Sequence, residues 1–411
     1  MESPEQWPAL LPTADPLGAF VSRLDVALSV SELTSRSLSD CSVAVKDMFD
    51  IAGSPTGAGT PRWPQTHPLP TETAETVSRL LLAGVTVVGK TVTDELAYSL
   101  SGTNVHWGTP VNSAAPGHTC GGSSCGSASA VSGGRADIGL GTDTGGSIRI
   151  PASYCGLVGF RPTHGRVSLR GCVPLAPRFD TVGWLTRRAG VSAAVGAVLL
   201  DPISPAHVPR APIQLLVWRD ALQLVEPGSR DGVDTAMAAI AGEFGTSSEL
   251  DLHPDVLTDW ADAFRVLQGF DCWHTHGDWI TRERPTFGPG ITSRFEAART
   301  VTASQADHSE AVARDARQRI DDLLGNDRVI LLPVAPDVAP AVNASRELKD
   351  RLRPATLRLT CAAGLAGLPT MSVPAARGTD GLPIGVALIG ARNSDEHLLR
   401  LALQLETAGA F

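Results

Sequence analysis

The chain has 411 residues, of which 43% are hydrophobic and 19% charged, and this is ample material for a large folded core. Its net charge of −9 gives none of the basic footprint that a nucleic-acid-binding protein carries. The longest apolar run, 190–200, is about half of what crosses a bilayer, and the first residues lack the basic start of a secretory signal. We therefore expect a cytoplasmic protein with neither nucleic-acid nor membrane partners.

The N-terminal third predicts short strands around a helix. Roughly the first 18 residues contain several prolines and are expected to be disordered. Residues 43–51 predict a strand that runs into a turn, and 73–83 predict an amphipathic helix that ends at Gly84. A buried strand follows at 85–88, and then a second helix is expected over 93–100, with Thr93 as its cap.

The centre of the chain, 119–175, is dominated by glycine and serine. Within it, 127–134 has the composition of a small-residue helix and 136–141 that of a strand. Glycine at this density costs conformational entropy on folding. A packed core has no reason to accept that cost, whereas a site where backbone approaches a ligand does. We therefore expect the functional site in this segment.

The C-terminal half predicts helices followed by strands. Residues from about 190 to 325 are expected to be mainly helical, and strands return at 329–335, 370–375 and 385–390. Strands at both ends of the chain, separated by helices, predict an α/β fold with one large mixed β-sheet surrounded by helices.

Two motifs match known sequence patterns but lack the flanking strands and helices that those patterns require. Residues 84–91 fit the phosphate-loop pattern G-x-x-x-x-G-K-[ST], but the four variable residues are themselves the predicted strand and a helix precedes them. We therefore expect no nucleotide cofactor. Residues 122–126 fit the G-x-S-x-G elbow of α/β-hydrolases, with His164 and His397 as available bases. The preceding segment is a poor strand and neither histidine stands in a suggestive setting, so this signal is weak.

A third constellation is more specific. Lys46 ends the segment VAVK, Ser123 lies in CGGSSCGSASA, and Ser147 lies in TDTGGSIRIPASYCGLVGF, with 24 residues separating the two serines. KTVTDELAYS near residue 90 and GLPIGVALIGARNSDEHLL near the C-terminus extend the pattern. The sequence resembles the amidase signature family, whose enzymes use a Ser–cis-Ser–Lys triad. The motifs cover residues 40–200 and about 360–405.

The resemblance implies a catalytic role for each of the three residues. Lys46 accepts a proton from Ser123, which follows a cis peptide bond and accepts a proton from Ser147. This role needs a neutral lysine, which burial favours because desolvation penalises the ammonium form. Backbone N–H groups for an oxyanion hole are expected from Thr144, Gly145, Gly146 and Ser147. Asp143 and Arg149 are expected to hold this loop by charge pairing, and Ser124 is a weaker candidate for a supporting role.

The resemblance also implies an organisation and a reaction. A single domain is expected over 1–411, with a core of 40–200 and 326–411 and a variable, mainly helical substrate-side region at about 201–325. Within the family the sequence looks most like plant-type indole-3-acetamide amidases and their bacterial relatives. The expected reaction is hydrolysis of a small arylacetamide, such as indole-3-acetamide, to a carboxylic acid and ammonia. Another small amide, a urea derivative or a role as an amidotransferase A-type subunit stays open.

No cofactor or metal is implied, and a homodimer stays open. The seven cysteines are odd in number and widely spread, so neither a disulfide framework nor a zinc site is predicted. Cys125 replaces a glycine that is usual in the family, and an oxidation-sensitive thiol near the site is one alternative. Trp273 and Trp279 are expected either to line an aromatic pocket or to pack a helix.

Overall fold

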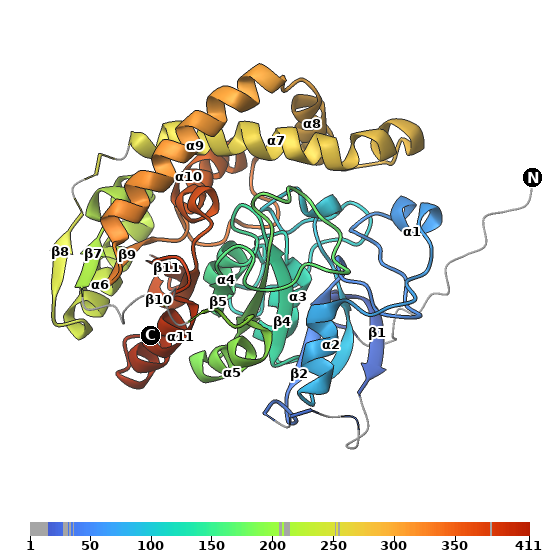
Figure 1. The fold of residues 1–411 in the computed structure, drawn as a ribbon, viewed down its shortest axis with the longest axis horizontal. Helices are drawn as coiled ribbons and strands as arrows, with labels where there is room; N and C mark the ends of the chain where they lie inside the picture. The colour runs from blue at the N-terminus through green and yellow to red at the C-terminus, as the bar shows by residue number, and fades with distance from the viewer. Residues whose placement is uncertain are drawn as a thin grey trace, which may run out of the picture.

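The computed structural model has a single mixed sheet at its centre (Figure 1). It describes residues 15–411 except 28–31, 33, 36, 205–207, 209–213, 251, 254 and 379. Within these residues, eleven strands pair in the order β1-β3-β2-β4-β6-β5-β10-β11-β9-β7-β8. The strands are β1 (Phe20–Val26), β2 (Ser42–Lys46), β3 (Thr86–Thr91), β4 (Ile138–Asp143), β5 (Val158–Arg161), β6 (Thr181–Thr186), β7 (Gln214–Val217), β8 (Ser247–Glu249), β9 (Arg328–Pro333), β10 (Thr370–Arg377) and β11 (Pro383–Gly390). The predicted α/β fold with a large mixed sheet is confirmed.

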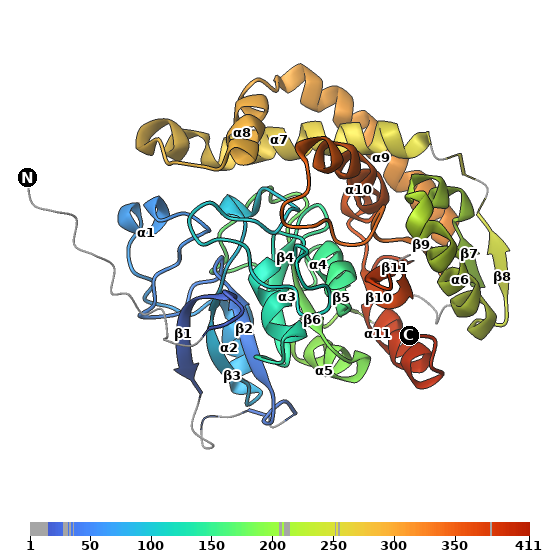
Figure 2. The same ribbon diagram turned by 180° about the vertical axis from the view of Figure 1, so that it is seen from behind.

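Helices cover both faces of this sheet and one of its ends. Figures 1 and 2 show α2, α5 and α11 on one face, α3, α4 and α6 on the other, and α7 to α10 gathered above the central strands. The α-helices are α1 (Arg62–Thr66), α2 (Glu75–Leu82), α3 (Cys125–Ser132), α4 (Arg149–Tyr154), α5 (Ala189–Leu199), α6 (Pro227–Glu243), α7 (Val256–Glu283), α8 (Pro289–Arg299), α9 (Ala303–Leu324), α10 (Arg346–Ala366) and α11 (Asp395–Thr407). Two 3₁₀ turns are η2 (Glu95–Ala97) and η4 (Arg219–Leu224).

Strand pairing places the glycine- and serine-rich centre of the chain in the middle of the sheet. β2 lies between β3 and β4 and is parallel to both, whereas β4 pairs antiparallel with β6. Alternate residues of β2 point to opposite faces. Val43 and Val45 enter the main apolar core, while Ala44 enters a smaller core together with Cys125 and Ala128 of α3. Lys46 follows the alternation of Ala44 and therefore reaches the face that α3 covers.

Most of the predicted elements are confirmed, but the helix expected at 93–100 is wrong. That segment forms only the single turn η2, in which Leu96 and Ala97 have φ angles of 47° and 56°. These positive φ values are incompatible with a continuing right-handed helix. The Thr93 hydroxyl donates to the carbonyl of Asp94 instead of capping a helix.

The mainly helical middle is confirmed, with two strands that the sequence pattern did not predict. β7 pairs parallel with β9 and β8 pairs parallel with β7, so both extend the sheet at one edge. Within the described residues, no helix is both long and apolar enough to span a membrane. The disorder expected over roughly the first 18 residues falls mostly outside the described residues. The single-domain organisation stays a prediction.

Candidate active site

Lys46 is held at the buried end of β2 by two hydroxyl groups. Its Nζ donates to Ser123 Oγ at 2.8 Å and to Thr142 Oγ1 at 2.7 Å. The lysine is fully buried. Burial lowers the pKa of Lys46 to about 8, because desolvation penalises the ammonium form more than nearby acidic groups favour it. The expected buried position of Lys46 is confirmed, whereas its partner Thr142 was not predicted.

The two serines lie on adjoining segments. The Gly122–Ser123 peptide bond is cis, as the resemblance implied. Ser147 lies two residues before the start of α4, is 3% exposed, and its carbonyl accepts from the N–H of Ser124 at 3.4 Å. Among the described residues, the hydroxyl of Ser123 is bonded to Lys46 and not to the hydroxyl of Ser147.

The turn from Thr144 to Ser147 contains the four residues whose N–H groups are expected to serve as oxyanion donors, and one of these groups already has a partner. The N–H of Gly146 donates to Asp143 Oδ1 at 2.9 Å, so this group is already bonded. Gly146 has a φ of +127°, a conformation that favours glycine, and a Cβ there would lie 3.1 Å from Thr360. Gly145 packs equally closely, with the ring of Phe264 at 3.2 Å from the position of a Cβ. Side chains of α7 and α10 therefore pack directly against this turn.

A buried charge network fixes the same turn, as the sequence predicted for Asp143 and Arg149. Asp143 accepts from Arg149 Nη2 at 2.9 Å and Nε at 3.0 Å, and from Arg161 Nη1 at 3.0 Å. Burial alone would raise the pKa of Asp143, but the charges of Arg149 and Arg161 outweigh it and hold the pKa well below its usual range. The role of Arg161 was not predicted. Arg149 also donates to the carbonyl of Thr360 at 2.8 Å, which ties the turn to α10.

Asp94 contacts the segment that contains the cis peptide bond between Gly122 and Ser123. Its Oδ2 accepts from the N–H of Gly102 at 3.2 Å and would lie 2.4 Å from a Cβ on Gly122, so only glycine fits there. Burial raises the pKa of Asp94 to about 6. The loop that follows Asp94 runs beside the serines, because the N–H of Gly122 donates to the carbonyl of Leu100 at 2.9 Å. The motif TDELAYS contains Asp94, but nothing in its pattern indicates this contact.

The residues of the two rejected motifs have other partners. Lys90, the lysine of the phosphate-loop match, lies within β3 and pairs with Asp47 at 2.9 Å in the buried interior. His164 is hydrogen-bonded with the carbonyl of Pro177, and His397 with Arg400 on α11, each at 2.9 Å. Among the hydrogen bonds of the described residues, none joins His164 or His397 to Ser123 or Ser147.

The remaining candidates are structural. Cys125 is fully buried, and burial raises the pKa of its thiol well above the usual value, which disfavours the reactive thiolate. The Ser124 hydroxyl donates to the carbonyl of Thr142 at 3.3 Å. Trp279 packs on Trp63 with ring centroids 5.0 Å apart and donates to Thr66 Oγ1, so helix packing explains it. Trp273 packs against the main core.

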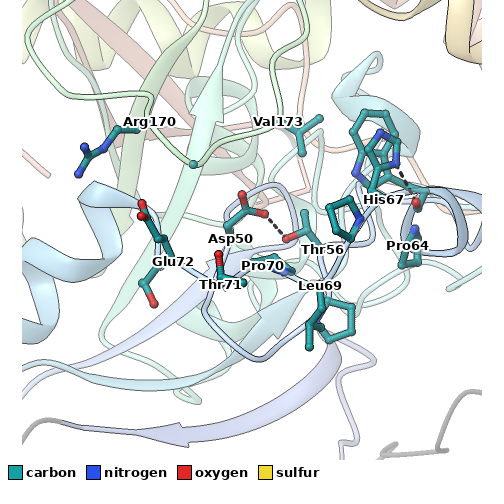
Figure 3. A pocket seen from close by; sticks show the side chains of 15 residues that line it. Asp50, Thr56, Pro64, His67, Leu69, Pro70, Thr71, Glu72, Arg170 and Val173 are labelled. Carbon is teal, nitrogen blue, oxygen red and sulfur yellow. Dashed lines mark hydrogen bonds between the residues drawn. The ribbon is translucent and has the colours of Figure 1, made fainter.

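A separate cavity of about 500 Å³ lies beside α1 (Figure 3). Trp63 and His67 stack at 3.8 Å and form one wall, and Asp50, Glu72 and Arg170 contribute charged groups. None of the predicted triad or oxyanion residues lines this cavity. Within the part of the chain that the structure describes, no three His, Cys, Asp or Glu side chains gather as metal ligands would.

Comparisons with known proteins agree with this geometry. The model of the amidase family matches residues 22–213 and 271–399. Amidase 1 of Arabidopsis thaliana is 36% identical over 95% of this chain and 98% of its own length. Indoleacetamide hydrolase of Pseudomonas savastanoi is 29% identical over 90% of this chain and 83% of its own length. A solved structure described as an amidase superposes with a TM-score of 0.78 at 30% identity, covering 91% of this chain and 86% of that one.

Proposed function

The chain belongs to the amidase family, and on that premise we propose that it hydrolyses a small carboxamide to a carboxylic acid and ammonia through an acyl-enzyme on Ser147. The observation that carries this proposal is the bond of 2.8 Å between Lys46 Nζ and Ser123 Oγ in a fully buried setting. A serine hydroxyl is a weak nucleophile until a neighbouring base removes its proton. A buried lysine with a pKa of about 8 is such a base when it is neutral.

The reaction proceeds in two halves. Ser147 Oγ attacks the amide carbonyl carbon and passes its proton to Ser123 Oγ, whose own proton moves to Lys46. The tetrahedral intermediate collapses, and Ser123 returns a proton to the departing nitrogen, which leaves as ammonia. Water then attacks the ester on Ser147 by the same proton route in reverse, which releases the acid and restores the free enzyme.

The negative oxygen of the intermediate needs N–H donors. Because the N–H of Gly146 already donates to Asp143, we assign this role to the N–H groups of Thr144, Gly145 and Ser147. A donor of this kind contributes about 2.7–4 kcal/mol to transition-state stabilisation in serine hydrolases. The Asp143 network holds these groups in place before the substrate arrives.

We assign arylacetamides, including indole-3-acetamide, as the preferred substrate class. The similarity to indoleacetamide hydrolase supports this choice. The ring of Phe264, which rests on Gly145 two residues before Ser147, supports it as well, because aromatic rings pair favourably with one another.

The test is ammonia release from a panel of amides that includes indole-3-acetamide, phenylacetamide and butyramide. Ser147→Ala and Lys46→Ala are expected to lose nearly all activity. Ser132→Ala, at the partly exposed end of α3, is the matched control and is expected to behave as wild type. Turnover of aliphatic amides alone would refute the arylacetamide assignment, and full activity of Lys46→Ala would refute the proposed base.

A further inference from the structure

The cavity beside α1 is lined by none of the residues assigned to the serine site (Figure 3). The loop over 61–73, which contains α1, supplies one part of its wall, and the turn from Arg170 to Val173 supplies another. Its volume of about 500 Å³ lies within the usual range of small-molecule sites in proteins. The cavity is therefore large enough to hold a small ligand of its own.

The aromatic wall of this cavity is fixed by contacts behind it. The His67 ring stacks on Trp63 with 10° between the ring planes, and His67 Nδ1 lies 2.9 Å from the carbonyl oxygen of Trp63. Trp279 of α7 packs on Trp63 and donates to Thr66 Oγ1 at 2.9 Å. These contacts order the wall without a ligand, so a ligand that binds here does not have to order it.

The carboxylate of Asp50 is held at the cavity through only one of its two oxygens. Thr56 Oγ1 donates to Asp50 Oδ1 at 2.6 Å and accepts from Lys90 Nζ at 3.0 Å. Lys90 also pairs with Asp47 at 2.9 Å, so the charge of the lysine is already matched. Among the described residues, no hydrogen bond or ion pair uses Asp50 Oδ2. A structural role explains the bond from Thr56 but leaves one carboxylate oxygen of Asp50 unused beside the cavity.

The other charged groups that line the cavity do not neutralise Asp50. Glu72 adds a second carboxylate, and no ion pair among the described residues uses it. The guanidinium of Arg170 is 76% exposed and lies 3.6 Å from Glu75, so this arginine already has an acidic partner. Figure 3 shows Asp50 between Glu72 and Arg170 on one side and His67 on the other. Two carboxylates without a partner favour a cationic ligand over an anionic one.

We propose that this cavity binds an arylalkylamine, a molecule in which a short apolar chain joins a protonated amine to a flat aromatic ring. The ammonium group donates to the unused oxygen of Asp50, and exposed Glu72 adds a weaker attraction. The ring packs against Trp63, Leu69 and Pro70 of the lining. The inference does not depend on the proposed amide hydrolysis, because the residues of the serine site lie outside the cavity.

The first test is calorimetric titration of the wild type, at neutral pH, with 2-phenylethylamine and with 2-phenylethanol, in which a neutral hydroxyl replaces the ammonium group. The amine should bind at least about tenfold more tightly, because a hydrogen bond between charged groups is stronger than one with a neutral donor. n-Propylamine, which has the ammonium group but no ring, should bind more weakly than 2-phenylethylamine. Equal binding of the amine and the alcohol, or binding of neither, would overturn the inference.

Substitutions test where the ammonium group binds. Asp50→Asn should bring the affinity ratio of amine to alcohol close to one. Because this change also alters the bond from Thr56, the exposed Glu72→Gln serves as a second variant and should weaken amine binding about two- to threefold. Asp262→Asn, which changes an exposed aspartate of α7, is the control and should leave amine binding unchanged. Wild-type affinity in both Asp50→Asn and Glu72→Gln would contradict the proposed site.

Competition on Ser147→Ala separates this cavity from the serine site. Excess phenylacetamide should leave the affinity for 2-phenylethylamine unchanged, because the two molecules bind at different places. Displacement of the amine by phenylacetamide would put the amine in the serine site and overturn the inference. If the wild type releases ammonia from no amide, the proposed function fails, whereas the amine site still stands on the preference for amine over alcohol and its loss in Asp50→Asn.

Discussion

Replacing Asp143 by Asn tests whether the buried charge network holds the nucleophile turn. The substitution keeps the size of the side chain but removes the charge that two buried arginines, Arg149 and Arg161, share. Breaking a buried ion pair on one side costs about 3–5 kcal/mol, because the remaining charge is left uncompensated in the interior. We therefore expect Asp143→Asn to lower the free energy of unfolding by about 3–5 kcal/mol.

The matched control is Asp137→Asn, just before the other end of β4. Asp137 pairs with Arg187 at 2.8 Å, but the two side chains are 36% and 42% exposed, so the pair should contribute about 1 kcal/mol or less. Both variants are compared by urea denaturation, followed by tryptophan fluorescence at neutral pH. Because the pKa of folded Asp143 lies below that of an unfolded aspartate, its contribution is complete above about pH 4. It is lost only as the pH falls toward the folded-state pKa. Equal effects of the two variants would refute the reasoning.

Two further predictions concern the site itself. Since Lys46 has a pKa of about 8 and acts when neutral, kcat/KM for an uncharged amide should rise about tenfold between pH 7 and pH 9. A profile that is flat over this range would exclude Lys46 as the base. Gly122→Ala places a Cβ 2.4 Å from Asp94 Oδ2 and should cost about 1–3 kcal/mol in stability as well as most of the activity. Gly242→Ala, on α6 with nothing within 4 Å of its Cβ, is the control and should change stability by no more than about 1 kcal/mol in thermal or urea unfolding.

Local patterns in the sequence were sufficient for the elements that carry the site. The apolar residues before Lys46 predicted a buried strand end, and the small-residue composition of 127–134 predicted the helix α3. The helix expected at 93–100 failed because composition does not reveal the positive φ angles of Leu96 and Ala97. The site residues beyond the resemblance were missed for a different reason. Lys46 meets Thr142 across 96 positions, and no pattern within one segment indicates such a contact.

The turn from Thr144 to Ser147 shows that family resemblance does not predict which N–H groups are free to bind an oxyanion. It implied four donors, but a side chain three residues earlier, Asp143, already accepts the N–H of Gly146. A motif fixes residue types and spacing, whereas the direction of each N–H depends on the turn conformation and on competing acceptors. The cytoplasmic location and the homodimer stay predictions.

The bond from Thr360 to Gly145 joins positions 215 residues apart, and this has a consequence for synthesis on the ribosome. At about 5–20 residues per second, the turn that carries Ser147 leaves the ribosome roughly 10–40 s before α10 exists to cover it. Throughout that interval Thr360 is missing from the glycine-rich segment. For most of it, Phe264 of α7 is missing as well. The nascent chain should therefore gain amidase activity only after α10 has been made, however early Lys46, Ser123 and Ser147 emerge.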